Sequence, residues 1–376
     1  MRLAVVANRV CRLGGMERAS AEVFSRVARE LDTTIIATEC EIADSNLTWL
    51  PVQAMKRPAV LNHASFARSA GKIERAGKYD LVVSVDSAAT SADVVIAHFC
   101  LAAFCARFAG LRGGSNAVRR LYQRVAEGSL SRHERRLYQS RRLRGVIAVS
   151  EGLKRELVEQ YKIAPSKIRV IPNGVDRTVF RPVESREAKV GLRRELGLPE
   201  AAFIAVFMGG DWNRKGLADV IRAVALVPEV QLVIVGRGNV AAFAQIAVDE
   251  KVSDRVRFVG LQSHPERYLA AGDVFVCPSR YETFSMSALE AAACGLPMLV
   301  VRTNGLEDFV EDGVNGFFVE PTVESVRARL AQAIANPALR CSMSRAAVKT
   351  AERFDWNAIA GETREVLESL ARVRAQ

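Results

Sequence analysis

FIAVFMGGDWNRKG, at residues 203–216, is the stretch that decides the fold class. Six consecutive apolar residues, 203–208, are followed by two glycines and then by a helical pattern that begins at Leu217. Consecutive rather than alternating apolar positions are typical of a parallel strand that helices cover on both faces. The order of strand, glycine turn and helix therefore predicts a βαβ unit.

The same alternation continues along the whole chain. Twelve short apolar runs are predicted as strands, at 3–7, 33–37, 81–85, 94–98, 146–149, 168–171, 203–208, 231–235, 256–259, 274–277, 298–301 and 316–319. Helical patterns lie between them, for example at 16–31, 217–227 and 286–293. This pattern predicts an α/β protein with doubly wound parallel sheets.

The series of strands restarts after Pro172-Asn173-Gly174, where a polar stretch runs to about Pro199. Proline, asparagine and glycine are typical of boundaries between domains. We therefore predict two Rossmann-like domains, at 1–172 and 173–355. Ligands of such sheets bind at the carboxyl ends of the strands, so the two domains are expected to face each other across a ligand cleft.

The composition excludes several classes of protein. Of 376 residues, 49% are hydrophobic and 25% charged, which is the balance of a globular chain rather than a disordered one. Seven cysteines form no C-x-x-C pair, and the four histidines form no H-E-x-x-H, so we expect reduced thiols and no metal site. The longest apolar run, 94–106, is shorter than the roughly 20 residues of a membrane-spanning helix. A cytoplasmic protein is expected.

Three loops carry residues suited to an anionic ligand. Gly14 and Gly15 open a helix after the first strand, and backbone N–H groups there suit a phosphate, although a plain tight turn would explain the same glycines. Arg214 and Lys215 follow the strand at 203–208 and could hold a pyrophosphate, or simply be solvated cations.

The third loop combines carboxylates with a helix start. Glu282 follows the strand at 274–277, and Glu290 lies eight positions later, in an otherwise apolar helix. Ser285, Met286 and Ser287 form the helix start between them. Carboxylates accept hydrogen bonds from sugar hydroxyls, and a helix N-terminus attracts phosphate. The alternative is that Glu290 lies at a solvent edge.

Five segments of the chain resemble the retaining glycosyltransferases of family 4 (group 1), whose fold of two Rossmann-like domains is called GT-B. They are GGMER at 14–18, VSE at 149–151, IPNGVD at 171–176, the E-x7-E signature from Glu282 to Glu290 with AAACGLP at 291–297, and DGVNG at 312–316. They occur in the expected order and cover nearly the whole chain. The resemblance also implies that a C-terminal helix, 356–376, packs back on the N-terminal domain.

The resemblance implies roles for the residues of these loops. Lys215 would hold the donor diphosphate, helped by Arg214 and by backbone N–H groups at Gly15, Ser285 and Met286. In the same family the equivalent of Glu290 binds the ribose hydroxyls of the donor.

Two residues are implied to act at the sugar, and we treat both as candidate catalytic residues. Glu282 would approach the transferred sugar. His98, after the strand at 94–97, matches a position that contacts the donor sugar, and a buried structural histidine is an equally good interpretation.

One position departs from the family pattern. The family usually has an arginine five residues before the lysine, and here that position is Gly210. The resemblance implies that Arg214 supplies that charge instead, as in relatives that resemble the lipopolysaccharide-core glucosyltransferases. The chain has no D-x-D motif for a metal. We therefore expect cations and helix dipoles to stabilise the leaving diphosphate, with no cofactor and no metal.

Two features of the sequence point to other classes of protein, and each lacks a required part. GRGNVA at 236–241 fits the G-x-G-x-x-A fingerprint of an NAD-dependent Rossmann oxidoreductase, but the next strand, 255–260, ends without the acidic residue that the fingerprint requires. A basic nucleic-acid-binding protein would need aromatic residues among its cations, and aromatic residues make up only 7% of the chain.

The positive charge is concentrated in one segment. Residues 107–144 hold eleven arginines and two glutamates, which accounts for nine of the chain's net eleven positive charges. Arg119, Arg120 and Arg124 surround an apolar face in the predicted helix, which favours contact of 107–125 with an anionic membrane over a solvated face. We therefore predict a peripheral enzyme at the inner face of the cell membrane. It would move a hexose from a nucleotide-sugar, UDP-sugar first, to a glycan or glycolipid such as a lipopolysaccharide core.

Overall fold

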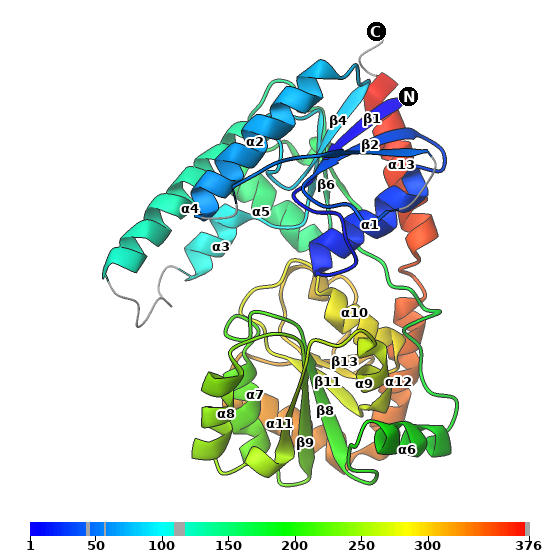
Figure 1. The fold of residues 1–376 in the computed structure, drawn as a ribbon. Coiled ribbons are helices and arrows are strands. Elements are labelled where there is room, and N and C mark those ends of the chain that lie inside the picture. The colour runs from blue at the N-terminus through cyan, green and yellow to red at the C-terminus, as the bar shows by residue number, and fades with distance from the viewer. Residues whose placement is uncertain (43–45, 56–57, 109–116, 373–376) are drawn as a thin grey trace. The chain divides into compact units, whose positions relative to one another are not determined.

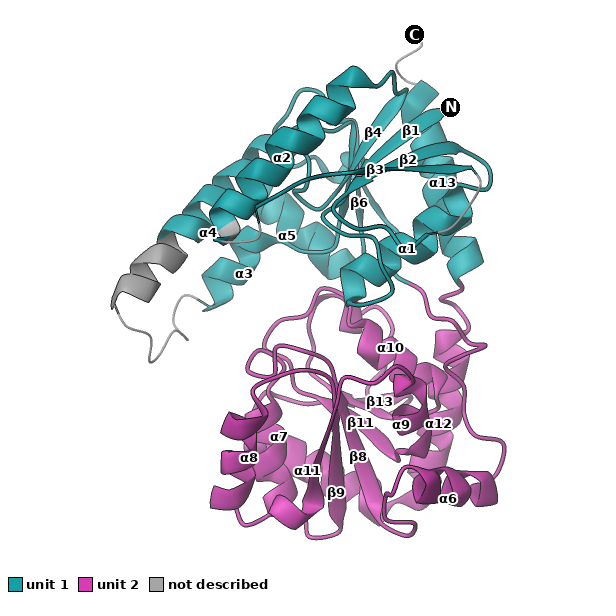
Figure 2. Cartoon of the chain, viewed as in Figure 1, with its two compact units in different colours: residues 1–173, 356–376 teal, residues 174–355 magenta. Residues whose placement is uncertain are grey.

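The computed structural model describes residues 1–42, 46–55, 58–108 and 117–372, apart from the side chains of residues 59 and 117–124. The chain divides into two compact units (Figure 2). Unit 1 comprises residues 1–173 and 356–376, and unit 2 comprises residues 174–355.

Unit 1 contains a parallel sheet of seven strands in the order β3-β2-β1-β4-β5-β6-β7 (Figure 1). The strands are β1 (Arg2–Val6), β2 (Asp32–Ala37), β3 (Leu47–Pro51), β4 (Leu81–Val85), β5 (Val94–Ala97), β6 (Gly145–Ala148) and β7 (Ile168–Val170). Every residue of β4, β5 and β6 is buried. This burial confirms that the consecutive apolar runs are strands covered on both faces.

Helices cover both faces of this sheet. They are α1 (Gly15–Val27), α2 (Ala59–Ala76), α3 (Leu101–Phe108), α4 (Ala117–Tyr138), α5 (Glu151–Tyr161) and α13 (Trp356–Arg372). The helices α1 and α13 lie together on one side, and α2 and α4 lie side by side on the other (Figure 1). The reversal of strand order after β3 explains this division, because right-handed crossovers in opposite directions place their helices on opposite faces.

The C-terminal helix α13 packs against unit 1. Asn357 accepts a hydrogen bond from Arg26 Nε at 2.9 Å, and Arg364 pairs with Glu30 at 2.5 Å. Further along, Arg144 Nη1 donates to the carbonyl of Leu370 at 3.0 Å. The last helix of the chain therefore belongs to the same unit as its first strand.

Unit 2 contains a six-stranded parallel sheet in the order β10-β9-β8-β11-β12-β13. Its strands are β8 (Phe203–Met208), β9 (Val230–Val235), β10 (Val256–Gly260), β11 (Val274–Cys277), β12 (Met298–Val300) and β13 (Gly316–Phe318). Its helices are α6 (Arg186–Glu195), α7 (Leu217–Ala225), α8 (Val240–Asp249), α9 (Pro265–Ala271), α10 (Met286–Ala293), α11 (Val323–Ala335) and α12 (Pro337–Ala351). The predicted doubly wound α/β class is thereby confirmed.

The predicted strands are all present, each within one residue of its expected bounds, and the structure adds one that was missed. The missed strand is β3 at the sheet edge, where Trp49 is 43% exposed and Pro51 ends the strand. An exposed edge strand lacks the apolar run of a central one, so periodicity gives no signal for it. The helix predicted at 16–31 was too long. It ends at Val27, because the N–H groups of Arg29 and Glu30 bond three residues back.

Candidate active site

A buried ion pair lies beyond the carboxyl ends of two central strands of unit 2. Lys215, in the loop after β8, and Glu282, in the loop after β11, are both buried. Lys215 Nζ lies 2.6 Å from Glu282 Oε1, and Arg214 Nη1 lies 3.3 Å from the same oxygen. The structure thus brings together three of the residues predicted to act on the donor.

The electrostatics of this cluster favour the charged forms. Burial acts to raise the pKa of Glu282, but the positive charges of Lys215 and Arg214 outweigh it and hold that pKa below its usual value. Burial acts to lower the pKa of Lys215, but its interactions with Cys277 and Glu282 outweigh that effect and raise it. Ser279 Oγ also donates to Glu282 at 3.2 Å. The pair is therefore ionised at neutral pH.

Two glycines make room for the lysine side chain. Gly209 has a φ of 139°, and a Cβ there would lie 2.7 Å from Lys215 Cε. Gly216 has a φ of 76°, and a Cβ there would lie 2.5 Å from the carbonyl oxygen of Pro278. The glycine turn after β8 is thus required by the close passage of Lys215 and of the neighbouring loop.

The start of α10 lies directly after the Glu282 loop. Ser285 precedes the helix with a φ of 68°, and its side chain does not cap the first turn. Uncapped N–H groups at a helix start attract anions. Met286 begins the helix, and Glu290 follows with its side chain buried on α10. Backbone donors and two carboxylates therefore come from one continuous segment of unit 2.

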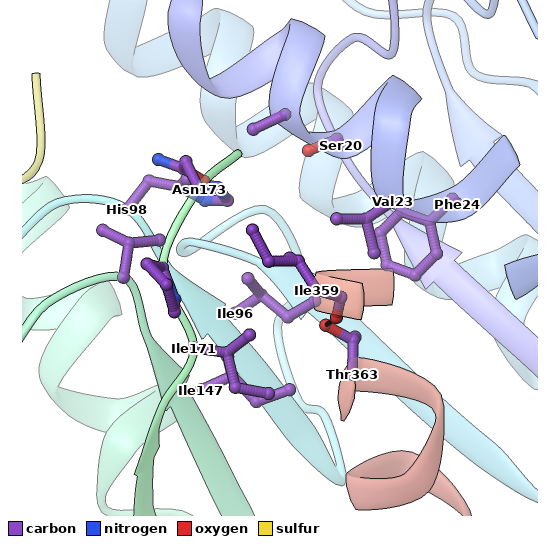
Figure 3. A pocket seen from close by; sticks show the side chains of 13 residues that line it. Ser20, Val23, Phe24, Ile96, His98, Ile147, Ile171, Asn173, Ile359 and Thr363 are labelled. Atoms are coloured by element: carbon purple, nitrogen blue, oxygen red, sulfur yellow. Dashed lines mark hydrogen bonds between the residues drawn. The ribbon is translucent and has the colours of Figure 1, made fainter. Parts of the chain in front are cut away.

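His98 lies in unit 1, directly after β5. Burial lowers the pKa of His98 to about 4, although a hydrogen bond with Asn173 acts in the opposite direction. Its Nδ1 is buried and has no hydrogen-bond partner in the described structure. The ring lines a cavity of about 20 Å³, large enough for one water molecule, and Asn173 lies beside it (Figure 3). The imidazole is neutral at pH 7, so it can exchange hydrogen bonds with uncharged hydroxyl groups.

A buried carboxylate that the sequence analysis did not identify supports the His98 loop. Asp86, after β4, accepts hydrogen bonds from the backbone N–H groups of His98 at 2.6 Å and Phe99 at 3.2 Å. Burial raises the pKa of Asp86 to about 7. Burial likewise raises the pKa of Glu134 to about 7, and Glu134 accepts a hydrogen bond from the Tyr161 hydroxyl. A lone aspartate after an apolar strand was the available signal, but its contacts with the loop after β5 appear only in the tertiary structure.

The helix start at Gly15 has an acidic residue close by. Gly14 precedes α1 with a φ of 99°, and a Cβ there would lie 2.2 Å from Glu17 Oε2. A carboxylate in the first turn is stabilised by the helix dipole, as an anionic ligand would be.

The GRGNVA motif at 236–241, which fits the fingerprint of NAD-binding proteins, has its glycines where close packing requires them. A Cβ on Gly236 would lie 2.3 Å from the Gly209 carbonyl oxygen, and one on Gly238 would lie 2.2 Å from the indole of Trp212. The strand β10 ends at Gly260, whose carbonyl accepts from the Gly236 N–H at 2.8 Å. The absence of a Cβ at Gly236 and Gly238 therefore lets this segment pack closely against the loop that carries Lys215.

One cluster among the described residues has the ligand types of a metal site. The ligand atoms of Cys11, Glu39 and Glu41 lie within 4.8 Å of one another. Arg9 contacts two of them, at 3.0 Å from Glu39 and 3.3 Å from the Cys11 sulfur, and the Arg12 N–H donates to Glu41 at 2.8 Å. A guanidinium thus contacts two of the three groups and a backbone N–H the third, which does not favour a metal.

The predicted membrane patch lies largely outside the described residues. The helix α4 includes positions 119, 120 and 124, but the side chains of Arg119, Arg120 and Arg124 are not described. Among the described helices, none is both long and apolar enough to span a membrane.

The fold defines the class of protein. The structure of WaaG, described as a glycosyltransferase involved in lipopolysaccharide biosynthesis, matches with a TM-score of 0.83 at 20% identity, over 97% of this chain and 99% of that one. HepE from Anabaena, solved in complex with UDP-glucose, matches with a TM-score of 0.75 at 20% identity, over 98% of this chain and 100% of that one. The chain therefore has the GT-B fold of glycosyltransferases.

Sequence comparison identifies the family. The model of glycosyltransferase family 4 matches residues 13–179, and that of glycosyl transferases group 1 matches residues 191–350. This chain belongs to the family 4, group 1 glycosyltransferases. It is 31% identical to the D-inositol 3-phosphate glycosyltransferase of Acidothermus cellulolyticus over 70% of this chain and 64% of that protein. The same-named protein of Thermobispora bispora is 32% identical over 58% of this chain and 54% of its own length. The chain thus spans about half to two thirds of these curated relatives.

Proposed function

We propose that this protein is a metal-independent, retaining hexosyltransferase that uses a nucleotide-sugar, UDP-sugar first. The observation that carries the proposal is the cluster of buried Lys215 and Glu282 with half-buried Arg214, beside the uncapped start of α10. Cations and helix N–H groups at one place suit a diphosphate, and a neighbouring carboxylate suits a sugar. The complex of HepE with UDP-glucose supports uridine as the base.

Departure of the nucleoside diphosphate is the step that this cluster would assist. Negative charge develops on the diphosphate as the glycosidic bond breaks, while the sugar becomes oxocarbenium-like. Lys215 and Arg214 would stabilise that charge together with backbone N–H groups at Ser285, Met286 and Gly15. In the structure Glu282 pairs with Lys215, so binding of a diphosphate would replace one anionic partner of this lysine with another.

The remaining residues would position the donor. Glu290, buried on α10, would accept hydrogen bonds from the ribose hydroxyls, and Glu282 would approach the transferred sugar. His98 would bind a sugar hydroxyl, a role that suits an imidazole whose pKa is lowered to about 4 by burial. A neutral ring can accept from or donate to a hydroxyl without desolvating a charge.

The acceptor that we propose is a glycan or glycolipid, of which a lipopolysaccharide core is one example. Eleven arginines within residues 107–144 support work at an anionic surface. A cytoplasmic enzyme that docks peripherally through 107–125 on the inner face of the membrane fits that charge.

A donor panel tests the proposed activity. Purified protein is incubated with UDP-, GDP- and ADP-glucose without metal, and slow release of sugar is followed by proton NMR, which also reports the anomer. We expect hydrolysis of the UDP-sugar with retention at the anomeric carbon, and loss of hydrolysis in Lys215→Met. Lys349→Met, on α12 of the same unit, is the matched control and keeps the wild-type rate. Failure of the wild type to bind or hydrolyse any of these donors would overturn the proposal.

A further inference from the structure

A basic groove lies in unit 1, on the face where α2 and α4 run side by side (Figure 1). It has a volume of about 570 Å³, within the range of small-molecule sites. Its ionisable lining consists of Arg68, Arg75, Arg132, Arg136, His63 and His133, and we call this site the arginine groove. None of its described lining residues is acidic.

The four arginines come in two pairs, and the spacing within each pair places its members on one face of a helix. Arg68 and Arg75 are seven positions apart on α2, and Arg132 and Arg136 are four apart on α4. Such spacing aligns side chains along one face of each helix. Like charges so aligned repel each other, and this repulsion would be relieved by an anion in the groove.

The arginines of the groove are exposed and have no carboxylate partner among the described residues. Arg142 of the same unit shows the contrast, because it pairs with Glu74 at 2.7 Å and with Asp93 at 3.1 Å. Carboxylates of the protein therefore neutralise Arg142. The positive charge of the groove could instead be neutralised by a bound anion.

A pair of histidines gives the groove a fixed wall. The rings of His63 and His133 meet edge to face with centroids 4.4 Å apart. Nε2 of each ring lies 3.1 Å from the carbonyl oxygen of Ser87, so each Nε2 must carry the proton that it donates. Thr90 and Ser129 add hydroxyl groups to the lining. Guanidinium and hydroxyl groups are donors that bind phosphate, and the imidazoles, held at the Ser87 carbonyl, fix the shape of the wall.

We propose that the arginine groove binds a phosphomonoester carried by the acceptor, an inference that rests on the proposed glycosyl transfer. A phosphomonoester carries nearly two negative charges, and guanidinium groups can bind its oxygens in pairs. Nucleic acid is disfavoured because the described lining contains no phenylalanine, tyrosine or tryptophan on which a base could stack. The groove is formed by other residues than the donor cluster of Lys215, so it would recognise a second substrate.

The experiment compares two double variants of the full-length protein. Arg68→Gln with Arg136→Gln removes two charges from the groove. Lys72→Gln with Arg135→Gln removes two charges from exposed positions on the same helices that do not line it. Binding of glucose 6-phosphate and of inorganic phosphate is measured by calorimetry without donor, and folding is checked by circular dichroism. Vesicles of phosphatidylglycerol and phosphatidylcholine form a separate arm.

We expect the wild type and the control variant to bind glucose 6-phosphate, and the groove variant to lose at least about tenfold in affinity, or about 1.4 kcal/mol. An equal loss of affinity for glucose 6-phosphate in both variants would overturn the proposal. It would show that binding depends on the overall charge of the unit and not on the groove. Binding to vesicles alone would overturn it in favour of a lipid surface. No turnover is measured, so this proposal and the proposed transfer can fail independently of each other.

Discussion

Lys215 Nζ lies 2.6 Å from Glu282 Oε1, although 67 positions separate the two residues in the chain. Both side chains are buried, and Arg214 contributes a second cation at 3.3 Å from the same oxygen. The Glu282 carboxylate therefore neutralises the two cations that we propose as the binding site of the donor diphosphate. Binding of the donor should therefore compete with the ion pair between Glu282 and Lys215.

Replacing Glu282 with glutamine should change binding and turnover in opposite directions. Loss of the carboxylate removes an anionic partner from both Lys215 and Arg214, so UDP should bind up to about tenfold more tightly. Turnover should fall on the order of 100-fold, because the group proposed to face the transferred sugar is lost. Calorimetry with UDP and an initial-rate assay measure the two effects. Glu229→Gln, an exposed change in the same unit, should alter neither. Weaker UDP binding in Glu282→Gln would contradict this competition.

Adding one methyl group at Gly209 should displace the lysine. The new Cβ would lie 2.7 Å from Lys215 Cε, at a φ of 139° that strains any side chain. A shift of about 1 Å in a catalytic group can cost on the order of 100-fold in rate. The neighbouring Gly210→Ala is the control, since its Cβ would come no closer than 3.8 Å to Arg237 and should cost little. Similar rates for the two variants would show that Lys215 does not depend on this close passage.

The contribution of Asp86 to stability should decrease as the pH rises from about 4 to about 7. Glu134 adds a contribution of the same sign, and His98, whose pKa is lowered by burial, one of the opposite sign. Burial raises the pKa of Asp86 to about 7 in the folded protein, above the 3.8 of an unperturbed aspartate. Between these values the folded state keeps a proton that the unfolded state releases, so the free energy of unfolding falls with pH. The slope is at most about 1.4 kcal/mol per pH unit for one proton. Urea unfolding at a series of pH values measures it.

The Asp86→Asn variant identifies the group responsible for that slope. Asparagine keeps the oxygen that accepts from the His98 and Phe99 N–H groups but has no charge to bury, so the slope of the unfolding free energy against pH should become more positive than in the wild type. Asp80→Asn, at an exposed position of unit 1, should keep the wild-type slope. If Asp86→Asn and the wild type show the same slope, Asp86 does not titrate as described.

Chelation should leave the proposed activity intact. Lys215, Arg214 and the start of α10 would supply the positive charge that a metal supplies in other enzymes. Turnover in EDTA should stay within about twofold of the untreated rate, with no stimulation by added Mg²⁺ or Mn²⁺. A loss of activity that Mn²⁺ restores would show that the leaving group requires a metal.

Residues 107–125 should bring the protein to anionic membranes. The wild type should co-sediment with phosphatidylglycerol vesicles at low salt and be released at high salt, because salt screens such contacts. Replacing Arg119, Arg120 and Arg124 by glutamine should weaken co-sedimentation, and neutral phosphatidylcholine vesicles serve as the control. Equal recovery of the wild type with both kinds of vesicle would argue against docking through charge.

The elements of the fold were largely predictable from the chain, and the edge strand β3 shows where prediction stopped. Buried strands such as β4 consist of consecutive apolar residues, which is a local signal. In β3 the alternation is weak and Trp49 is partly exposed, so only pairing with β2 identifies it as a strand. The loops that carry Gly209, Lys215 and Glu282 were likewise evident, because each follows an apolar strand directly.

The amino-acid sequence by itself determined two parallel α/β sheets, the loops at their strand ends and the residue types that those loops carry, since all three depend on short-range patterns. Only the tertiary structure decided which charges meet. The contact between Lys215 and Glu282, the burial of Asp86 and the gathering of arginines from α2 and α4 in the arginine groove all involve segments far apart in the chain. Burial and ion pairing depend on distance in space, and packing of the helices on the sheets sets those distances.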